Sequence, residues 1–294
     1  MNDAAPAGLV VVDKPGGWTS HDVVARTRRL AGTRKVGHAG TLDPMATGVL
    51  LLGVGRATRL LGHLQLADKE YLATIRLGES STTDDAEGEL TPVASASGLT
   101  GPQVEAAMVP LTGAIEQVPS SVSAIKVDGQ RAYARVRSGE DVALAARPVT
   151  VEVFEALATR PAADGLLDVD VRVVCSSGTY VRALARDLGT ALGVGGHLTM
   201  LRRTRVGGFG LDVARTLDEL AQSFTYVSID DAARAAFPTL DLDADTAQEV
   251  RYGRRLAGLE LGAPGPVALL DPEGAFLALY EQRGPDARPV AVFV

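Results

Sequence analysis

The run GHAGTLDP at residues 37–44 most constrains how this chain can fold. It places two glycines, one imidazole and one carboxylate just ahead of residues 49–54, an apolar segment typical of a buried strand. The carboxylate of Asp43 has two possible roles there. In an Asp-Pro dipeptide it often bonds nearby backbone N–H groups and caps a turn or a helix, or it can act as a catalytic group.

Further blocks along the chain favour the catalytic role. They are DKEY at 68–71, PSSVSAIK at 119–126, CSSGTYVR at 175–182 and LRRT at 201–204. Together with GHAGTLDPMATGVLLLGVGRAT at 37–58, they resemble in order and spacing the signature of the TruB family of pseudouridine synthases. Members of that family isomerise one uridine in the T loop of tRNA, and the matching blocks cover about residues 8–210.

The resemblance implies three catalytic residues. Asp43 falls on the family's catalytic aspartate, as nucleophile or base, and Arg182 on the arginine that pairs with it. Tyr71 matches the tyrosine that stacks on the flipped base and is positioned to take the C5 proton. Without the family context, the competing roles are a half-buried strand residue for Tyr71 and a solvent-facing helix residue for Arg182.

The resemblance also implies five substrate-binding residues, which are His38, Tyr180, Leu201, Arg59 and Lys126. His38 would fill the space that the flipped base leaves, and Tyr180 and Leu201 would line the uracil pocket. Arg59 and Lys126 would lie near the RNA. The competing roles are a solvated loop histidine for His38 and core packing for Tyr180 and Leu201.

Val122 and Thr82 depart from the family pattern, where an aromatic residue and an aspartate are common. Both departures concern contacts of two loops with RNA and leave the set around Asp43 unchanged.

The motifs favour a reaction without metal or cofactor. The four histidines are far apart, and no Cys or His pair has the spacing of zinc ligands. Neither a phosphate-binding P-loop nor a GxGxxG dinucleotide fingerprint occurs. Pseudouridine formation breaks the C1′–N1 bond and rejoins the base through C5 without oxidation or hydrolysis, so one carboxylate is enough.

The charge of the chain is unevenly distributed. The formal net charge is −7, which disfavours RNA binding as a whole. However, residues 176–211 carry five Lys or Arg against one acidic residue, whereas residues 61–125 carry two against nine. Because phosphate contacts act locally, a basic face can still hold an RNA backbone.

Hydrophobic periodicity predicts the elements and an α+β fold. Strands are expected over 9–13, 49–54, 71–77, 167–173, 267–270, 276–280 and 290–294. Helices are expected over 21–30 with Ser20 as cap, 56–66, 103–111, 180–188 and 248–256. Residues 79–102 are expected to be mostly loop, and Asp128-Gly129 to form a hairpin turn. The family fold implies a mixed, largely antiparallel central sheet flanked by helices.

Two domains are expected, a catalytic domain over 1–237 and a small β-rich domain over 238–294. The first carries an RNA-binding insertion over 119–147, and the second resembles a PUA-like RNA-binding domain. The single cysteine, the lack of an export signal and the lack of a membrane span of about 18 apolar residues predict a cytoplasmic protein. We expect a monomer that binds the T arm of tRNA.

Two alternatives to this enzyme stay open. One is an RNA-binding or RNA-folding protein, which would not require the carboxylate of Asp43. The other is a guide-RNA-dependent synthase, whose larger terminal extensions are not evident here.

Overall fold

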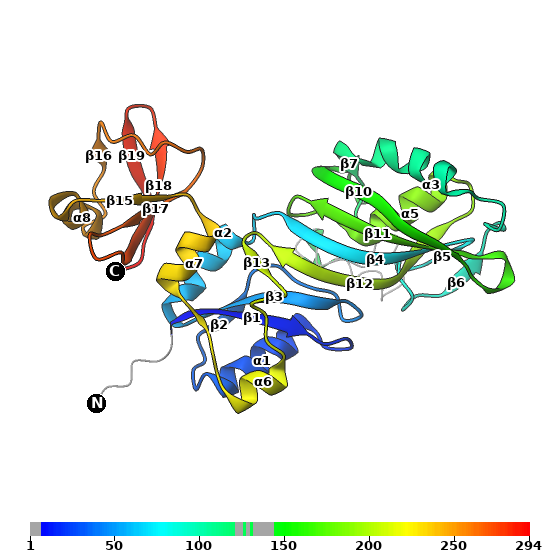
Figure 1. Cartoon of the computed structure of the whole chain (residues 1–294), viewed down its shortest axis with the longest axis horizontal. Coiled ribbons are helices and arrows are strands. Elements are labelled where there is room, and N and C mark those ends of the chain that lie inside the picture. Colours follow the sequence, from blue (N-terminus) through cyan, green and yellow to red (C-terminus); the bar gives the residue numbers. More distant parts are fainter. Residues whose placement is uncertain (1–6, 121–125, 128–129, 132–143) are drawn as a thin grey trace. The chain divides into compact units, whose positions relative to one another are not determined.

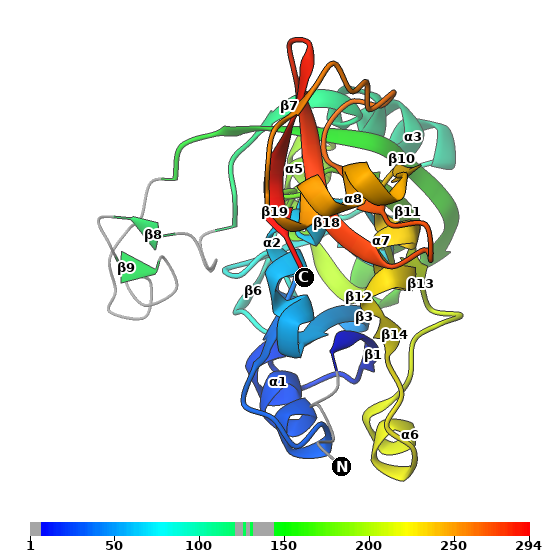
Figure 2. The same ribbon diagram turned by 90° about the vertical axis from the view of Figure 1, so that its left-hand side faces the viewer.

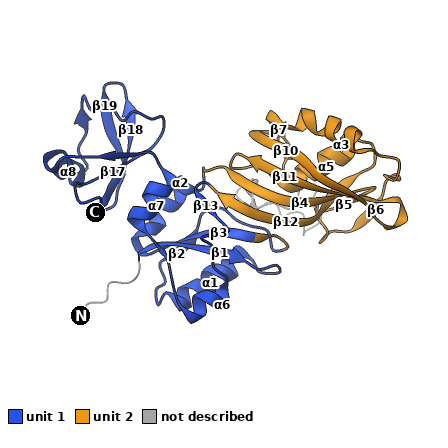
Figure 3. Ribbon diagram, in the orientation of Figure 1, with its two compact units in different colours: residues 1–44, 48–65, 207–294 blue, residues 45–47, 66–206 orange. Residues whose placement is uncertain are grey.

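The structure is a computed structural model, and it describes residues 7–120, 126–127, 130–131 and 144–294 (Figure 1). The chain divides into two compact units (Figure 3). Unit 1 comprises residues 1–44, 48–65 and 207–294, and unit 2 comprises 45–47 and 66–206.

In the first part of unit 1, β1 lies between β3 and β14 and pairs antiparallel with both, and β2 also pairs antiparallel with β3. Strands β1 and β3 are buried at nearly every position, and α6, α7 and η1 pack against β1. Such strands read as continuous apolar runs rather than alternating ones. The elements are β1 (Gly8–Lys14), α1 (Ser20–Leu30), β2 (Val36–His38), β3 (Thr47–Val54), η1 (Gly55–Leu60), α2 (Leu61–Leu64), α6 (Leu217–Gln222), β14 (Val227–Ser228) and α7 (Ile229–Ala236).

The prediction that Ser20 caps α1 is wrong. Thr19 is the N-cap, and its side chain forms a reciprocal capping box with Asp22. Ser20 faces inward and binds the backbone of Leu42 instead. Both residue types are good N-caps, so this tertiary contact decides which of them takes the position.

Unit 2 contains an antiparallel sheet in the order β12-β4-β11-β10-β7, with α3 and α5 packed on it. Leu167, Val169, Val171 and Val173 of β11 are buried, as their alternation predicts. The elements are β4 (Lys69–Leu77), β5 (Glu79–Ser81), β6 (Leu90–Pro92), α3 (Gly101–Met108), η2 (Val109–Leu111), β7 (Gly113–Gln117), β8 (Lys126–Val127), β9 (Gln130–Arg131), β10 (Arg147–Pro161), η3 (Ala163–Gly165), β11 (Leu167–Cys175), α5 (Val181–Ala191) and β12 (Gly196–Val206). A short strand, β13 (Phe209–Gly210), follows β12 in the sequence.

Cross-strand ion pairs stabilise the polar face of this sheet. Arg76 and Arg172 on neighbouring strands bind Asp168 and Glu70, each at 2.8 Å. Such pairs are the sheet counterpart of i,i+4 pairs on a helix.

Unit 1 also contains a second sheet, and we refer to residues 238–294, which include it, as the C-terminal module. Its five-stranded sheet has the order β15-β17-β18-β19-β16 and encloses a core with α8 around the buried ring of Tyr280. The elements are β15 (Thr239–Asp241), α8 (Ala244–Arg251), β16 (Leu256–Ala257), β17 (Val267–Leu270), β18 (Phe276–Arg283) and β19 (Asp286–Val292).

Several predicted boundaries shift. The helix predicted over 248–256 starts and ends earlier, because Asp243 caps α8 and Leu256 starts β16. The helix predicted over 56–66 is a 3₁₀ turn followed by one α-helical turn. Residues 79–102 include the short strands β5 and β6. Strands β8 and β9, which flank the turn predicted at Asp128-Gly129, pair with each other (Figure 2). The two turn residues themselves are not among the described residues.

Within the described residues, no helix has the length and apolar character needed to cross a membrane.

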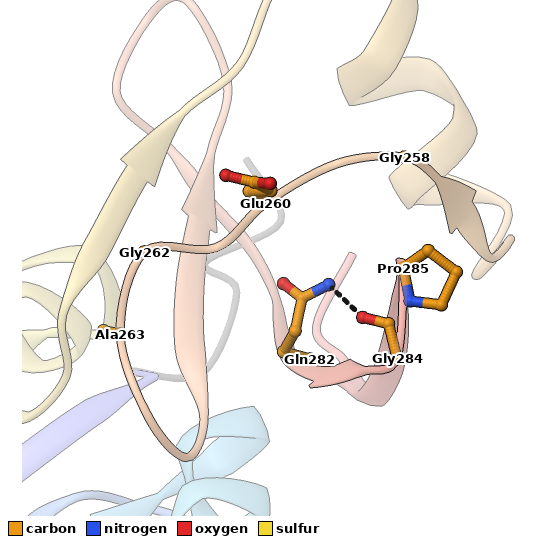
Figure 4. A pocket seen from close by; sticks show the side chains of 7 residues that line it. All are labelled: Gly258, Glu260, Gly262, Ala263, Gln282, Gly284 and Pro285. Atoms are coloured by element: carbon orange, nitrogen blue, oxygen red, sulfur yellow. Dashed lines mark hydrogen bonds between the residues drawn. The ribbon is translucent and has the colours of Figure 1, made fainter.

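A pocket in the C-terminal module is lined by Gly258, Glu260, Gly262, Ala263, Gln282, Gly284 and Pro285 (Figure 4). Its only ionisable lining side chain is Glu260, so it offers no positive charge to a phosphate. The predicted site residues lie elsewhere.

Candidate active site

The loop that carries Asp43 is fixed on both sides of the carboxylate. On one side, the Leu42 N–H donates to Ser20 Oγ (2.9 Å), and the Ser20 hydroxyl donates to the Leu42 carbonyl (3.1 Å). On the other side, the Pro44 carbonyl accepts from the N–H of Gly17 (2.8 Å). The next element is strand β3, so Asp43 does not cap a helix. This removes the helix-capping interpretation of the Asp-Pro dipeptide.

A fully buried lysine strengthens this arrangement. Lys14, at 0% exposure, ends β1, and its Nζ donates to the carbonyls of Pro15 (2.9 Å), Trp18 (2.7 Å) and Pro44 (3.1 Å). An ammonium group has three N–H donors, so a buried one is best stabilised by several acceptors. Lys14 therefore ties the end of β1 to the residue that follows Asp43. This role was not predicted from the sequence, where the available signal was that Lys14 ends an apolar run and directly precedes Pro15.

His38 and Arg59 belong to the same unit as Asp43. His38 ends β2 opposite Leu52, and its half-buried ring packs edge-on against the ring of His21, with centroids 5.6 Å apart. His38 is therefore not simply a solvated loop histidine. Arg59 lies in η1, where its guanidinium contacts the end of the C-terminal module.

Tyr71 and Leu201 occupy neighbouring strands of unit 2. Tyr71 on β4 lies opposite Arg203 of β12, and Ala73 lies opposite Leu201. Directly paired residues point to the same side of a sheet, so these four side chains share one face, and all are buried. Arg203, at 1% exposure, is the largest fully buried side chain among the residues that the structure describes. The LRRT block signalled it, but sequence reasoning gave it no role.

Arg182, the second residue of α5, binds the loop that follows β5. Its Nη1 donates to the Thr83 carbonyl (3.0 Å) and lies 3.3 Å from Asp85 Oδ2. Both side chains are almost completely buried. Asp85 is itself oriented, because its Oδ1 accepts from the Thr83 hydroxyl (2.6 Å) and the Glu87 N–H (3.0 Å). Arg182 is thus not a solvent-facing helix arginine.

Asp85 was not identified from the sequence. It lies in the acidic stretch at 79–102 that the composition marks as loop, and only the fold brings it to α5. The neighbouring Asp84 forms a more exposed pair with Arg186 at 3.1 Å.

Tyr180 is the N-cap residue of α5, and the buried side chain of Gln117 fixes its backbone. The Tyr180 N–H donates to Gln117 Oε1 (2.8 Å), and Gln117 Nε2 donates to the Tyr180 carbonyl (3.1 Å). Two glycines let α5 approach β12, since a Cβ at Gly189 or Gly196 would meet the facing backbone within 2.6 Å. The start of α5, with Tyr180 and Arg182, is therefore held rigidly.

The remaining predicted residues are placed only in part. Lys126 is in β8, but its side chain lies outside the described part of the structure. Val122, Arg135 and Arg137 are also outside it. Thr82 lies in the loop before Asp85, and its N–H donates to the Glu89 carbonyl (3.1 Å). Among the described side chains, His, Cys, Asp and Glu form no group of three that could hold a metal ion.

Known proteins match this chain along almost its whole length. The family described as "TruB family pseudouridylate synthase (N terminal domain)" matches residues 28–181. Two further families match the rest of the chain. The one described as "tRNA pseudouridylate synthase B C-terminal domain" matches residues 182–241, and the one described as "tRNA Pseudouridine synthase II, C terminal" matches residues 237–294. The chain belongs to the TruB family.

Relatives named tRNA pseudouridine synthase B are closely similar. The protein from Arthrobacter sp. (strain FB24) is 60% identical over 98% of this chain and 96% of its own. That from Nocardia farcinica (strain IFM 10152) is 61% identical over 97% and 92%. These relatives confirm the predicted family and make this TruB member a pseudouridine synthase.

A solved structure shares the fold. It is described as an H/ACA RNP bound to a substrate RNA containing 2′-deoxyuridine, and one of its chains is 25% identical with a TM-score of 0.72. The match covers 98% of this chain and 85% of that one. The predicted α+β class, with a largely antiparallel sheet and a small β-rich C-terminal module, is confirmed.

Proposed function

We propose that this chain isomerises one uridine in the T loop of free tRNA to pseudouridine, with Asp43 as the catalytic carboxylate. The C1′–N1 bond breaks, the detached uracil turns, and a C5–C1′ bond forms. C5 then loses a proton and N1 gains one, so the reaction consumes no cofactor. Asp43 either attacks covalently or acts as a base on the sugar. The observation that carries the proposal is the identity of about 60% to tRNA pseudouridine synthases of the same length.

The other site residues have supporting roles in the proposal. The target base must be flipped out of the folded loop, at a cost of a few kcal/mol. The ring of Tyr71 offsets part of this cost by stacking on the base, and its hydroxyl takes the C5 proton. His38 fills the vacated space, while Tyr180 and Leu201 line the uracil pocket. Arg182 pairs with the carboxylate of Asp43 and orients it.

We further propose how the protein holds its RNA. Residues 119–147, with Lys126, contact the T arm, and residues 238–294 form a second RNA-binding domain after a catalytic domain over 1–237. The enzyme acts as a cytoplasmic monomer. Its one cysteine, Cys175, is free and buried, which suits a reducing compartment.

The free-tRNA reaction is favoured over a ribonucleoprotein activity by the degree of similarity. Identity is about 60% to relatives named for tRNA, but 25% to the chain of the H/ACA RNP structure. A purely RNA-binding role would not require a carboxylate whose two neighbouring residues are both held by hydrogen bonds to other segments.

Replacement of Asp43 tests the function. Asp43→Asn should abolish turnover while leaving tRNA affinity and the unfolding temperature close to wild type, because the amide retains hydrogen bonding but cannot attack or accept a proton. Pseudouridine is mapped in tRNA after incubation with each purified protein. Asp212→Asn, at an exposed carboxylate of the same unit, is the control. If Asp43→Asn kept a tenth of the activity, or lost tens of degrees of stability, a structural role for Asp43 would be favoured.

A further inference from the structure

The sequence predicts that Arg59 contacts RNA, but the structure gives its side chain a partner inside the protein. The guanidinium carbon lies 5.0 Å from the centroid of the Phe293 ring, a cation–π distance. The same group donates a hydrogen bond to the carbonyl of Val292. Arg59 is in η1, far from these residues in the sequence, so it joins η1 to the end of the C-terminal module.

Phe293 is well placed to receive this contact. Although it is the penultimate residue, it is only 2% exposed. Its ring packs on that of Phe276 with centroids 4.8 Å apart, and its N–H donates to the Leu277 carbonyl (2.8 Å). The end of the chain is therefore fixed to β18, and one aromatic face remains for Arg59.

A second set of contacts joins the module to α7. The Phe276 N–H donates to Asp230 Oδ1 (2.7 Å), and Arg234 Nη2 donates to the Gly274 carbonyl (2.9 Å). Gly274 has a φ of +83°, and a Cβ there would lie 2.8 Å from Arg234 Nη2. The close approach and the positive φ both favour glycine at this position.

We propose that Arg59 and Phe293 form a clamp that fixes the C-terminal module on η1 and α7, and thereby strengthens tRNA binding. This rests on the proposed function. Two RNA-binding parts of one protein bind more tightly when their geometry is preorganised, because the second contact forms at a high effective concentration. Arg59 acts as a positioning residue here, through Phe293 and not through a phosphate.

The test separates the clamp from a direct phosphate contact. Arg59→Ala removes both the cation and the hydrogen bond, whereas Phe293→Leu keeps a buried apolar side chain and removes only the aromatic face. Both are combined in a double variant. Arg56→Ala is the matched control, because Arg56 is exposed on the same short helix. For each protein we would measure tRNA affinity at several salt concentrations, the single-turnover rate at saturating enzyme, and protease cleavage within 237–243.

If the clamp operates, each single variant weakens tRNA binding about threefold to tenfold with an unchanged salt slope and an unchanged saturating rate. Protease cleavage within 237–243 becomes faster in both variants, while Arg56→Ala is cleaved at the wild-type rate. The double variant binds no more weakly than Arg59→Ala alone, because that replacement already removes the cation–π contact that Phe293→Leu removes.

Either single variant behaving as wild type overturns the clamp. A salt slope that is flatter by about one for Arg59→Ala, but not for Phe293→Leu, would also overturn it and would assign Arg59 to a phosphate. A wild-type protein that forms no pseudouridine would instead refute the proposed function, and the cleavage assay would still report on the clamp.

Discussion

Tyr71 combines a buried position with a polar end. Its side chain shares a sheet face with Ala73, Leu201 and the fully buried Arg203. In the proposed function, its ring stacks on the flipped base and its hydroxyl takes a proton. These two contributions are separable by experiment.

Tyr71→Phe should bind tRNA with near-normal affinity but turn over at least about tenfold more slowly, because stacking persists and the general base is lost. Single-turnover rates and affinities measured on the same tRNA check this. Near-normal turnover would reduce Tyr71 to a stacking platform.

The buried pair between Arg182 and Asp85 gives a second prediction at this scale. Removing one partner of a buried ion pair leaves a poorly compensated charge. Asp85→Asn should therefore lower the free energy of unfolding by about 3 kcal/mol and slow turnover, since Arg182 loses its orientation.

Asp84→Asn is the matched control. Asp84 pairs with the more exposed Arg186, so its loss should cost about 1 kcal/mol or less. Urea unfolding and turnover assays compare the two variants. Equal losses of unfolding free energy in the two variants would show that burial does not make the Arg182–Asp85 pair more important for stability than the Arg186–Asp84 pair.

Among the elements, β4 places a lysine where water is largely excluded. Lys69 lies opposite Cys175 of β11 and Val206 of β12. Burial lowers the pKa of Lys69 to about 8 and raises the pKa of the Cys175 thiol to about 11. A buried lysine with a lowered pKa destabilises the fold while it is charged.

The sign of the pH effect follows from proton linkage. Between pH 8 and 10.5 the unfolded chain binds more protons at Lys69 than the folded one, so this residue makes stability rise with pH. Lys69→Met should be more stable than wild type at pH 7 by up to about 3 kcal/mol, and the difference should shrink toward pH 10.5.

Urea unfolding of both proteins at pH 7, 8.5 and 10 checks this. Cys175 has the opposite effect at alkaline pH, but it is present in both proteins and largely cancels. A difference that did not change with pH would show that Lys69 stays charged in the fold.

Elements with strong periodicity could be predicted from the sequence. The apolar runs of β1 and β3 and the alternation in β11 gave their positions within a few residues. Choices that depend on tertiary contacts could not be predicted. Thr19 replaces Ser20 as cap because Ser20 binds Leu42, and Leu256 joins a strand because β19 pairs with it.

The same limit applies to the candidate site. The family resemblance named Asp43, Tyr71 and Arg182, but not the residues that hold them. Asp85 and Lys14 act across large sequence separations, and no local pattern links them to Arg182 or Pro44. The roles of the named residues in catalysis remain predictions.

For the whole molecule, the acidic net charge must be reconciled with an RNA substrate. Within the sheet of unit 2, four arginines are already paired with carboxylates, so they are poor candidates for phosphate contacts. They are Arg76, Arg160, Arg172 and Arg205, paired with Asp168, Asp170, Glu70 and Asp68. The sequence predicts phosphate contacts from a few arginines within 126–147 and 176–211. In the second range, Arg182, Arg186 and Arg205 are paired with carboxylates and Arg203 is buried, so we expect most of these contacts from 126–147.

A few contacts give a shallow salt dependence. Each neutralised phosphate contributes a slope of about −0.7 to −0.9 to log affinity against log salt, so we expect roughly −2 to −5 in total. Arg135→Ala or Arg137→Ala should flatten this slope by up to about one, because each replacement removes a single phosphate contact. Asp43→Asn should leave the slope unchanged, because Asp43 acts on the nucleoside and not on the backbone. Equilibrium binding of tRNA across a salt series measures all four proteins. A slope near zero would mean that base stacking dominates recognition, and an unaltered slope in both arginine variants would move the phosphate contacts to other parts of the chain.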